Sequence, residues 1–342
     1  PAAYGGDGVF LANQSALVAK DTVFQGNQGA GIHVTSGARA KIEACTFKEN
    51  GDAGFLVAQS GTGTILGSEF IGNGLVGVYL SNQGSVEIED TAFRGHGVAG
   101  VQSEGSSEGR LKRCRFTETD GHGVQGLETT KLWIQASKFT GCGGFGLEAS
   151  SKAEVHLKDC EFSANTRGGV ESVDDTVVEF DASTFIGHEA FGVALRLRTK
   201  GTCRNCRFLE NGRGALVADE AKFDVSESEF KENQGDGLTL TGSASGTIQN
   251  NSFVGNGRAG VTIHGVARPV VRENQLTGNV LAGIWACAKS GGTLRENIVD
   301  GTSSFCLLVT DEANPALQNN TCRNTGTGGL VVSSEEVFKG VL

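Results

Sequence analysis

Hydrophobic residues recur along this chain with a period of 23 residues. The clearest series is a column of phenylalanines, which we take as position zero of the repeat: Phe24, Phe47, Phe70, Phe93, Phe116, Phe139, Phe162, Phe185 and Phe208. It continues as Phe230, Phe253, Leu276, Val299 and Cys322. Only the step from Phe208 to Phe230 is one residue short. A strict period of this length is typical of architectures in which each repeat stacks on the next.

Two alternating segments flank the Phe column. Seven residues after the Phe stands a glycine, and after it apolar residues alternate with other residues, as in 78–80 and 238–240. Before the Phe, inward residues such as Ile88 and Leu111 stand between charged neighbours. Alternation with a period of two predicts short strands with one buried face, and the Phe column marks a third strand. No segment has a 3.6-residue apolar period long enough to predict a helix.

Three strands within 23 residues leave no room for a crossover helix, so each strand must pair with its equivalent in the next coil. A β-propeller would need a period of about 40 residues and four antiparallel strands, which excludes that fold. The sequence therefore predicts an all-β, single-domain parallel β-solenoid over residues 1–342. Dividing 342 residues by 23 gives about 15 coils.

Polar columns accompany the Phe column. Asparagine recurs three residues after the Phe, as in Asn50 and Asn73, and His96 and His188 replace it in two repeats. Asparagine tolerates left-handed backbone and bonds to like residues in a stack, so we predict turn ladders. The repeated glycine predicts either a positive φ or a close approach of another backbone segment.

The net charge of −10 comes from acidic and basic residues that are interleaved on the outer columns. No basic stripe exists, which argues against nucleic-acid binding, and no apolar run reaches membrane-spanning length, which argues against a membrane-spanning segment. Cys114, Cys160 and Cys206 share a column two coils apart, ~9.6 Å, beyond disulfide reach. We interpret them, and the Cys203–Cys206 pair, as buried thiols without a metal or other cofactor. Unpaired thiols predict a cytoplasmic location.

The ends of the chain also fall within the repeat. Gly8 already occupies the glycine column with no Phe before it, and the chain stops about three residues before the next expected Phe. We therefore expect a piece of a longer multidomain protein. Uncapped terminal coils predict self-association end to end.

Candidate binding chemistry lies at outward positions after the repeat glycine. The residues selected are Tyr79, Gln102, Glu104, Gln125, Glu148, Glu171, Asp174, Asp175, Arg196 and Trp285. Carboxylates on adjacent coils, ~5 Å apart, suit acid–base catalysis or cation binding, and they suit a solvated surface equally well. Leu56 and Leu308 are expected to be exposed in the column of Tyr79, and Trp133 to point outward from another sheet.

Residues 119–123, Thr-Asp-Gly-His-Gly, resemble the Gly-His-Gly motif of polygalacturonase-type glycoside hydrolases. However, Gly121 and Gly123 are ordinary repeat positions, and the Asn-Thr-Asp and Arg-Ile-Lys motifs of that family are absent. We therefore predict no catalytic role for His122.

The repeat unit F-x-x-N…G-[IVL]-x-[VL]…[IVL]-x-x-[CSTN]-x-F resembles the parallel β-helix of the pectin-lyase-like superfamily over the whole chain. The resemblance implies a right-handed helix. That superfamily contains polysaccharide lyases, hydrolases and uronan epimerases, and also non-catalytic repeat regions. No turn here grows beyond the 23-residue frame to build a cleft.

We therefore predict a non-catalytic scaffold that presents an elongated surface to a protein or polysaccharide partner. The first alternative is a carbohydrate-active enzyme that uses the outward carboxylates. The second is a spacer between flanking domains.

Overall fold

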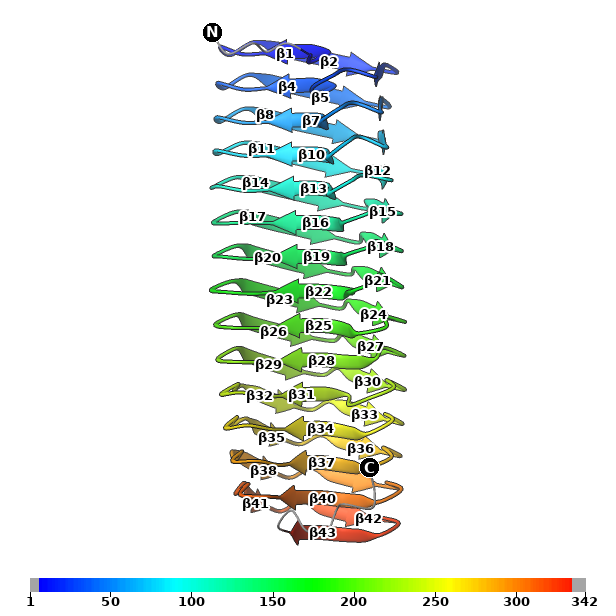
Figure 1. Ribbon diagram of the computed structural model, residues 1–342, viewed down its shortest axis with the longest axis vertical. Helices are drawn as coiled ribbons and strands as arrows, with labels where there is room; N and C mark the ends of the chain where they lie inside the picture. The colour runs from blue at the N-terminus through cyan, green and yellow to red at the C-terminus, as the bar shows by residue number, and fades with distance from the viewer. Residues whose placement is uncertain (1–5, 334–342) are drawn as a thin grey trace. The chain divides into compact units, whose positions relative to one another are not determined.

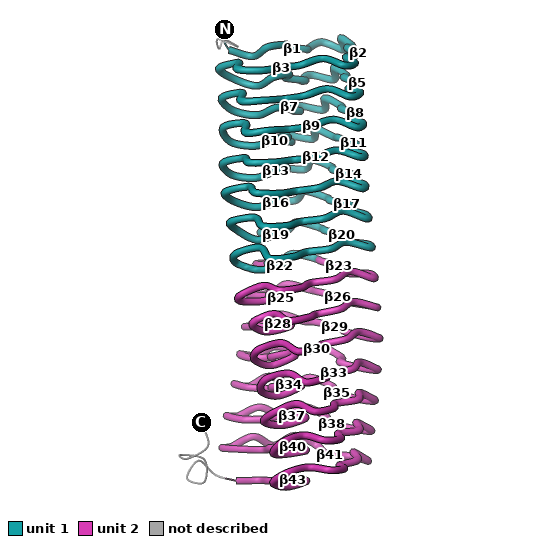
Figure 2. The backbone as a smooth tube through the Cα atoms, turned by 90° about the vertical axis from the view of Figure 1, so that its right-hand side faces the viewer, with its two compact units in different colours: residues 1–171, 175–177 teal, residues 172–174, 178–342 magenta. Residues whose placement is uncertain are grey.

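The computed structural model describes residues 6–333, which contain short strands and turns and no helix. Every turn of the chain contributes one strand to each of three parallel sheets, which we name A, B and C in chain order. The chain divides into two compact units, residues 1–171 with 175–177 and residues 172–174 with 178–342 (Figure 2). The boundary falls within one strand of sheet A and one strand of sheet B.

In unit 1, the strands of each sheet follow one another at every third element (Figure 1). Sheet A contains β1 (Val9–Leu11), β4 (Ile32–Val34), β7 (Ala53–Val57), β10 (Val76–Leu80), β13 (Ala99–Ser103), β16 (His122–Gly126), β19 (Phe145–Ala149) and β22 (Gly168–Ser172). Sheet B contains β2 (Ala16–Lys20), β5 (Arg39–Glu43), β8 (Thr62–Leu66), β11 (Ser85–Glu89), β14 (Glu108–Lys112), β17 (Lys131–Gln135) and β20 (Glu154–Lys158). Sheet C contains β3 (Val23–Gln25), β6 (Thr46–Lys48), β9 (Glu69–Ile71), β12 (Ala92–Arg94), β15 (Arg115–Thr117), β18 (Lys138–Thr140) and β21 (Glu161–Ser163).

Unit 2 repeats this order. Its sheet A contains β25 (Phe191–Leu195), β28 (Arg213–Val217), β31 (Leu238–Leu240), β34 (Ala259–Ile263), β37 (Ala282–Ala286), β40 (Phe305–Thr310) and β43 (Gly328–Ser333). Its sheet B contains β23 (Val177–Asp181), β26 (Lys200–Arg204), β29 (Lys222–Ser226), β32 (Thr247–Gln249), β35 (Val270–Arg272), β38 (Thr293–Arg295) and β41 (Ala316–Gln318). Its sheet C contains β24 (Thr184–Ile186), β27 (Arg207–Leu209), β30 (Glu229–Lys231), β33 (Ser252–Val254), β36 (Gln275–Thr277), β39 (Ile298–Asp300) and β42 (Thr321–Arg323).

The pairing register follows the repeat of the sequence. In sheet C, Phe93 pairs with Phe116 and Phe116 with Phe139, each pair one repeat apart in the sequence. The predicted all-β parallel solenoid is thus confirmed, with about 14 turns of ~23 residues. The predicted end-to-end association depends on the ends of the chain, residues 1–5 and 334–342, which lie outside the described residues.

The Phe column forms the centre of each unit. In unit 1 the rings of Phe116 and Phe139 stack 4.7 Å apart at 5°, and in unit 2 those of Phe208 and Phe230 stack 4.4 Å apart at 2°. All four side chains are fully buried. Burying an aromatic ring contributes roughly 1.5–3 kcal/mol, so this column is a main source of stability.

Side-chain ladders hold the turns together. The Asn50 side-chain amide donates to Asn73 Oδ1 at 2.9 Å and to the Phe24 carbonyl at 3.1 Å, so the predicted asparagine ladder is confirmed. The left-handed backbone was assigned to the wrong position, because it belongs to the preceding residue, Glu49, with φ 53°. His96 takes its place in the ladder by accepting the Asn73 backbone N–H at 3.2 Å.

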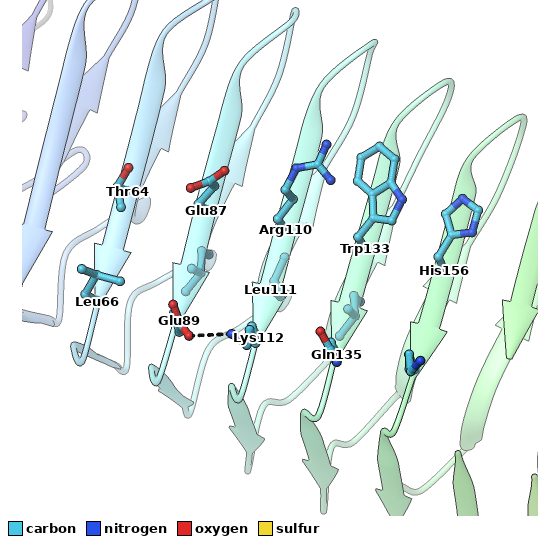
Figure 3. Close-up of a pocket in the computed structure, with 13 residues that line it drawn as sticks. Thr64, Leu66, Glu87, Glu89, Arg110, Leu111, Lys112, Trp133, Gln135 and His156 are labelled. Carbon is cyan, nitrogen blue, oxygen red and sulfur yellow. Dashed lines mark ion pairs between the residues drawn. The ribbon is translucent and has the colours of Figure 1, made fainter. Parts of the chain in front are cut away.

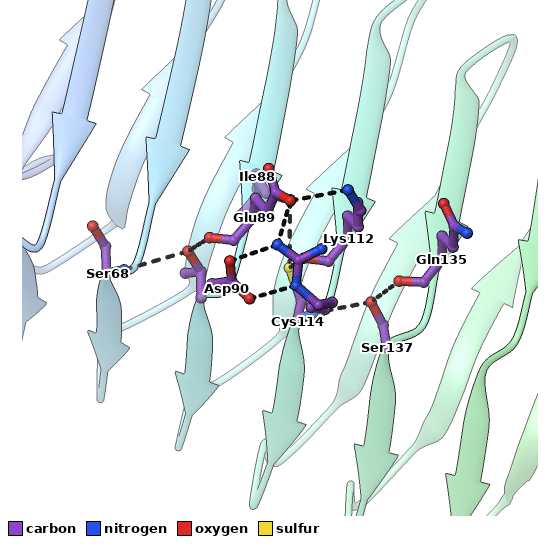
Figure 4. Close-up of polar contacts among 10 residues, drawn as sticks. Ser68, Ile88, Glu89, Asp90, Lys112, Cys114, Gln135 and Ser137 are labelled. Atoms are coloured by element: carbon purple, nitrogen blue, oxygen red, sulfur yellow. Dashed lines mark hydrogen bonds and ion pairs between the residues drawn. The ribbon is translucent and has the colours of Figure 1, made fainter.

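A second ladder runs along the corner between sheets B and C (Figure 4). There the Ser68 backbone N–H donates to Thr91 Oγ1 at 3.4 Å, and that of Cys114 to Ser137 Oγ at 3.1 Å. At this corner a single residue, such as Arg113 with φ 52°, takes the left-handed conformation.

Close packing explains the repeat glycine. Gly31 does not have a positive φ, but a Cβ atom at this position would lie 2.7 Å from the carbonyl oxygen of Gly54 in the next turn. Contacts below 3.0 Å are essentially absent for real Cβ atoms, so the close-approach alternative is the correct one.

Among the described residues, all the free cysteines are buried, and they include Cys114, Cys160, Cys203 and Cys206 as predicted. Cys306 and Cys322 form a disulfide with Cα atoms 5.7 Å apart. This disulfide was not predicted, because only cysteines in the same column were compared and these two occupy different columns. The cytoplasmic location stays a prediction. Within residues 6–333 there is no helix of the length and apolarity that a membrane crossing requires.

Candidate functional site

The outward face of sheet A in unit 1 carries two rows of side chains. One row consists of Tyr79, Gln102, Gln125 and Glu148, which are register partners on β10, β13, β16 and β19, as the period predicted. The other row stands three residues earlier in each turn and includes His122. Gly123 and Val124 between the rows both face the core, since a Cβ at Gly123 would meet the Phe139 ring and Val124 is fully buried.

Three side chains of these rows form one hydrogen-bonded cluster. His122 Nε2 lies 3.1 Å from Glu148 Oε2, and Gln125 Nε2 donates to the same oxygen at 2.7 Å. The side chains of His122 and Glu148 are 14% and 24% exposed. Both contacts hold one carboxylate oxygen of Glu148 in place.

Phe145, the residue after His122 in its row, orients the imidazole. Its backbone N–H donates to His122 Nδ1 at 3.2 Å, and the two rings stack 6.0 Å apart at 8°. Because Nδ1 accepts a hydrogen bond, the neutral imidazole carries its proton on Nε2 and donates it to Glu148.

Burial lowers the pKa of His122, and Arg167 lowers it further, while the negative charges of Glu148 and Glu171 oppose this. The imidazole is therefore neutral at neutral pH and serves as an oriented donor. Within residues 6–333, Glu148 Oε1 makes no hydrogen bond. This oxygen is available to accept a proton from a ligand.

Tyr79 forms a second polar pair on the same face, because its hydroxyl donates to the Glu104 carboxylate. Burial raises the pKa of Tyr79, and the hydrogen bond and charge of Glu104 raise it further, so the phenol stays protonated. The ring also packs on the buried cluster of Ala53, Val76 and Ala99, next to the partly buried Leu56.

The remaining predicted residues are divided between the units. Glu171 on β22 and Asp175 belong to unit 1, and the Asp175 N–H donates to the Ser151 carbonyl at 2.8 Å. Asp174 and Arg196 belong to unit 2, where the Arg196 guanidinium lies 5.8 Å from the Phe191 ring centre.

Trp285, on β37 of unit 2, has its indole N–H bonded to Thr310 Oγ1 at 3.1 Å and the Arg258 guanidinium over its ring at 5.3 Å. The predicted exposure of Leu308 was wrong. Leu308 is 2% exposed and packs with Phe305 and Trp285 in an apolar cluster.

The contact between His122 and Glu148 is the feature that sequence reasoning missed. The two residues are one repeat plus three residues apart, so they occupy different columns. The same offset recurs near the N-terminus, where His33 Nδ1 lies 3.1 Å from Asp7 Oδ2. A search for polar pairs at this offset would have found both contacts.

No group of three or more His, Cys, Asp or Glu side chains in the described part of the chain is arranged to hold a metal ion.

Comparison with protein families places the fold. The family model described as right handed beta helix region matches residues 3–129, 53–200, 99–245 and 213–340. The chain belongs to the right-handed β-helix family. No curated protein matches the chain.

Two solved structures illustrate the fold similarity. The periplasmic alginate epimerase AlgG is 15% identical, with a TM-score of 0.59 over 81% of this chain and 77% of that chain. The A-module of the Azotobacter vinelandii mannuronan C-5 epimerase AlgE4 is 15% identical, with a TM-score of 0.59 over 87% of this chain and 89% of that chain. At this identity the likeness shows the fold.

These comparisons correct the functional prediction. The two solved structures named above are carbohydrate-active enzymes, so the prediction of a non-catalytic scaffold was wrong, and the enzyme alternative is the better supported one. The error came from the premise that a catalytic β-helix must build its cleft from long loops. In this chain a hydrogen-bonded cluster with a partly exposed carboxylate, Glu148, lies on the outward face of sheet A itself.

Proposed function

We propose that unit 1 carries the active site of a carbohydrate-active enzyme that abstracts a proton from a uronate polysaccharide lying along sheet A. The observation that carries the proposal is the geometry of Glu148. His122 and Gln125 hold its Oε2, while its Oε1 has no partner among the described residues. A carboxylate fixed in this way is a positioned general base.

In this reaction Glu148 Oε1 would accept the proton from the sugar carbon next to the uronate carboxyl group. The electron pair left on that carbon delocalises into the carboxylate, and a nearby cation stabilises the charge. Arg167 is close enough to His122 to lower its pKa and is the cation that we assign to this role. The carbanion then either expels the oxygen of the neighbouring glycosidic bond, as in a lyase, or takes up a proton on the opposite face, as in an epimerase.

Tyr79 has a different role from Glu148 because the two residues lie far apart along the row. Its row position is three strands from that of Glu148, ~14 Å at the spacing of a sheet, so both cannot act on one sugar. Tyr79 and Gln102 instead suit the binding of sugar residues further along the chain. The AlgG and AlgE4 structures, named as an alginate and a mannuronan epimerase, support a uronate substrate.

A second candidate is glycoside hydrolysis by Glu148 and Glu171. They occupy the same row one turn apart, ~5 Å, which is close to the carboxyl separation of about 5–5.5 Å in retaining glycosidases.

The test incubates the purified protein with polymannuronate and polygalacturonate in heavy water. Deuterium uptake at C5, followed by NMR, reports an epimerase, which returns a solvent proton to that carbon. The absorbance of the new double bond between C4 and C5 reports a lyase, whose product has no hydrogen at C5. The variant E148Q should lose activity about a hundredfold to ten-thousandfold, the usual contribution of a general base. The matched control is E69Q, because Glu69 is an exposed carboxylate on β9 of sheet C.

Equal rates for E148Q and the parent would refute the assignment of Glu148. New reducing ends from a neutral glucan, without deuterium uptake from uronans, would favour the hydrolase candidate.

A further inference from the structure

Sheet B of unit 1 has a groove of about 490 Å³ on its outward face, away from the side chains of the proposed active site. It runs across the strands between two rows of side chains (Figure 3). Arg110 and Trp133 belong to one row and Lys112 and Gln135 to the other, on β14 and β17. Its volume lies within the range of ordinary ligand sites.

A stack of side chains holds one wall of the groove. The Arg110 guanidinium lies 4.1 Å from the centre of the Trp133 ring, and the His156 ring stacks on the other side at 5.8 Å and 6°. The cation–π contact fixes the arginine while its N–H groups remain able to bind an anion. The ion pair of Arg110 with Glu108 is long, at 3.9 Å.

The charge of the groove differs from that of the chain. Three basic side chains, Arg110, Lys112 and Lys158, line it against two acidic ones, Glu87 and Glu89, whereas the whole chain has a net charge of −10. Glu89 and Lys112 pair with one another at 3.1 Å and cancel in this balance (Figure 4). Glu89 also pairs with Arg113, which does not line the groove. The groove is therefore complementary to an anion.

The basic groups are spaced along the groove. Arg110 and Lys112 stand on one strand and Lys158 two strands further on, ~9.6 Å away, with Trp133 and Gln135 between them. In an extended two-fold uronate chain, successive residues face opposite sides, so every second carboxylate points the same way. Such a chain can present one carboxylate to each basic position and a sugar ring to Trp133 and Gln135.

We infer that the groove on sheet B is a second, non-catalytic binding site for an anionic polysaccharide of uronate residues. The choice of a uronate over other anions rests on the proposed function. A peptide strand is disfavoured because the backbone of β17 already pairs with β14 and β20, which leaves no strand edge for it to join.

The chain contains two tryptophans, Trp133 and Trp285, so W285F leaves Trp133 in the groove as the only tryptophan reporter. We would titrate W285F with oligomannuronate and oligogalacturonate and follow the tryptophan emission, and confirm binding by retention in a polymannuronate gel. The emission should change in a saturable manner. Adding R110Q and K158Q should weaken binding about tenfold to a hundredfold, as expected for lost charge-assisted contacts.

The matched control adds R115Q and K138Q, which remove the same charge from β15 and β18 of sheet C and should leave the affinity unchanged. Adding E148Q to W285F should lower turnover about a hundredfold to ten-thousandfold and leave this binding intact, so failure of the groove and failure of the active site are distinguishable. The inference is overturned by an unchanged emission, by equal affinity with and without R110Q and K158Q, or by a polyglutamate peptide that binds as tightly as the uronates.

Discussion

Replacing His96 by asparagine should remove a source of acid sensitivity from unit 1. His96 is fully buried within the asparagine ladder, where its Nδ1 accepts the Asn73 N–H at 3.2 Å. Its Nε2 has no hydrogen-bond partner among the described residues, and neither has the nearby ladder residue Thr119 at Oγ1. Burial lowers the pKa of His96 to about 4, against the weaker opposing effect of the backbone groups of Asn73 and Phe70.

The sign and size of the effect follow from this pKa. An unfolded histidine titrates near about 6.5, so between about pH 6.5 and pH 4 the unfolded state binds more protons than the folded state. Stability is therefore fully present above about pH 6.5 and falls as the pH is lowered towards about 4. The loss is about 2 kcal/mol near pH 5 and about 3 kcal/mol once both states are protonated.

Asparagine at position 96 does not titrate and fits the ladder. By analogy with Asn73, whose side-chain amide donates to the Phe47 carbonyl at 3.1 Å, it would donate to the Phe70 carbonyl and accept from Asn73. We expect H96N to lose less stability than the parent between about pH 7 and pH 5, by about 2 kcal/mol. Urea unfolding at the two pH values measures this difference.

The control for removal of a histidine is H264N, because His264 is exposed. It should retain the pH dependence of the parent. If H96N and the parent lose the same stability on acidification, then His96 is not the acid-sensitive group and the reasoning from its burial fails.

Two further predictions concern stability. F116A should lower the free energy of unfolding by about 3–5 kcal/mol, because this ring is fully buried between Phe93 at 4.8 Å and Phe139 at 4.7 Å. Urea unfolding tests this against F10A, whose ring is 37% exposed, and an equal loss in both variants would contradict it. The disulfide between Cys306 and Cys322 closes a loop with a sequence separation of 16, so C306S with C322S should cost about 3 kcal/mol. Hydrogen exchange of β40 and β42 should become faster in that variant, and unchanged protection would argue against a stabilising role.

Most of the fold could be predicted because equal positions of the repeat lie on top of one another. Phe116 pairs with Phe139 and Asn50 bonds to Asn73, and in each case the partner is one period away. The left-handed corner at Arg113 could not be predicted in this way, because arginine has no preference for a positive φ. The sign of it lies in the other members of the column, since Gly67, Asp90 and Asn205 at equivalent positions are residue types that tolerate a positive φ.

The candidate site was only partly predictable for the same reason. The period brings Gln125 beside Glu148, and their hydrogen bond connects equal positions. His122 reaches Glu148 across one repeat plus three residues, and this diagonal contact is visible only once the two outward rows are placed in space. The prediction of no catalytic role for His122 rested on its flanking glycines, Gly121 and Gly123, which are ordinary repeat positions, and on the absence of the two other family motifs.

A position where the residue type of a column changes is therefore a better indicator of function than the positions where the column is regular. The row of sheet A to which His122 belongs has small apolar residues in the preceding turns, Ala53, Val76 and Ala99, which form a buried cluster. At position 122 this row changes to histidine. That change occurs one turn before Glu148, where the carboxylate needs an oriented donor. Stability resides in the repeated columns, so E148Q, which keeps the size of a partly exposed side chain, should leave the urea midpoint near that of the parent while activity falls. A variant that lost both together would indicate that Glu148 supports the fold and would remove the argument for a catalytic base.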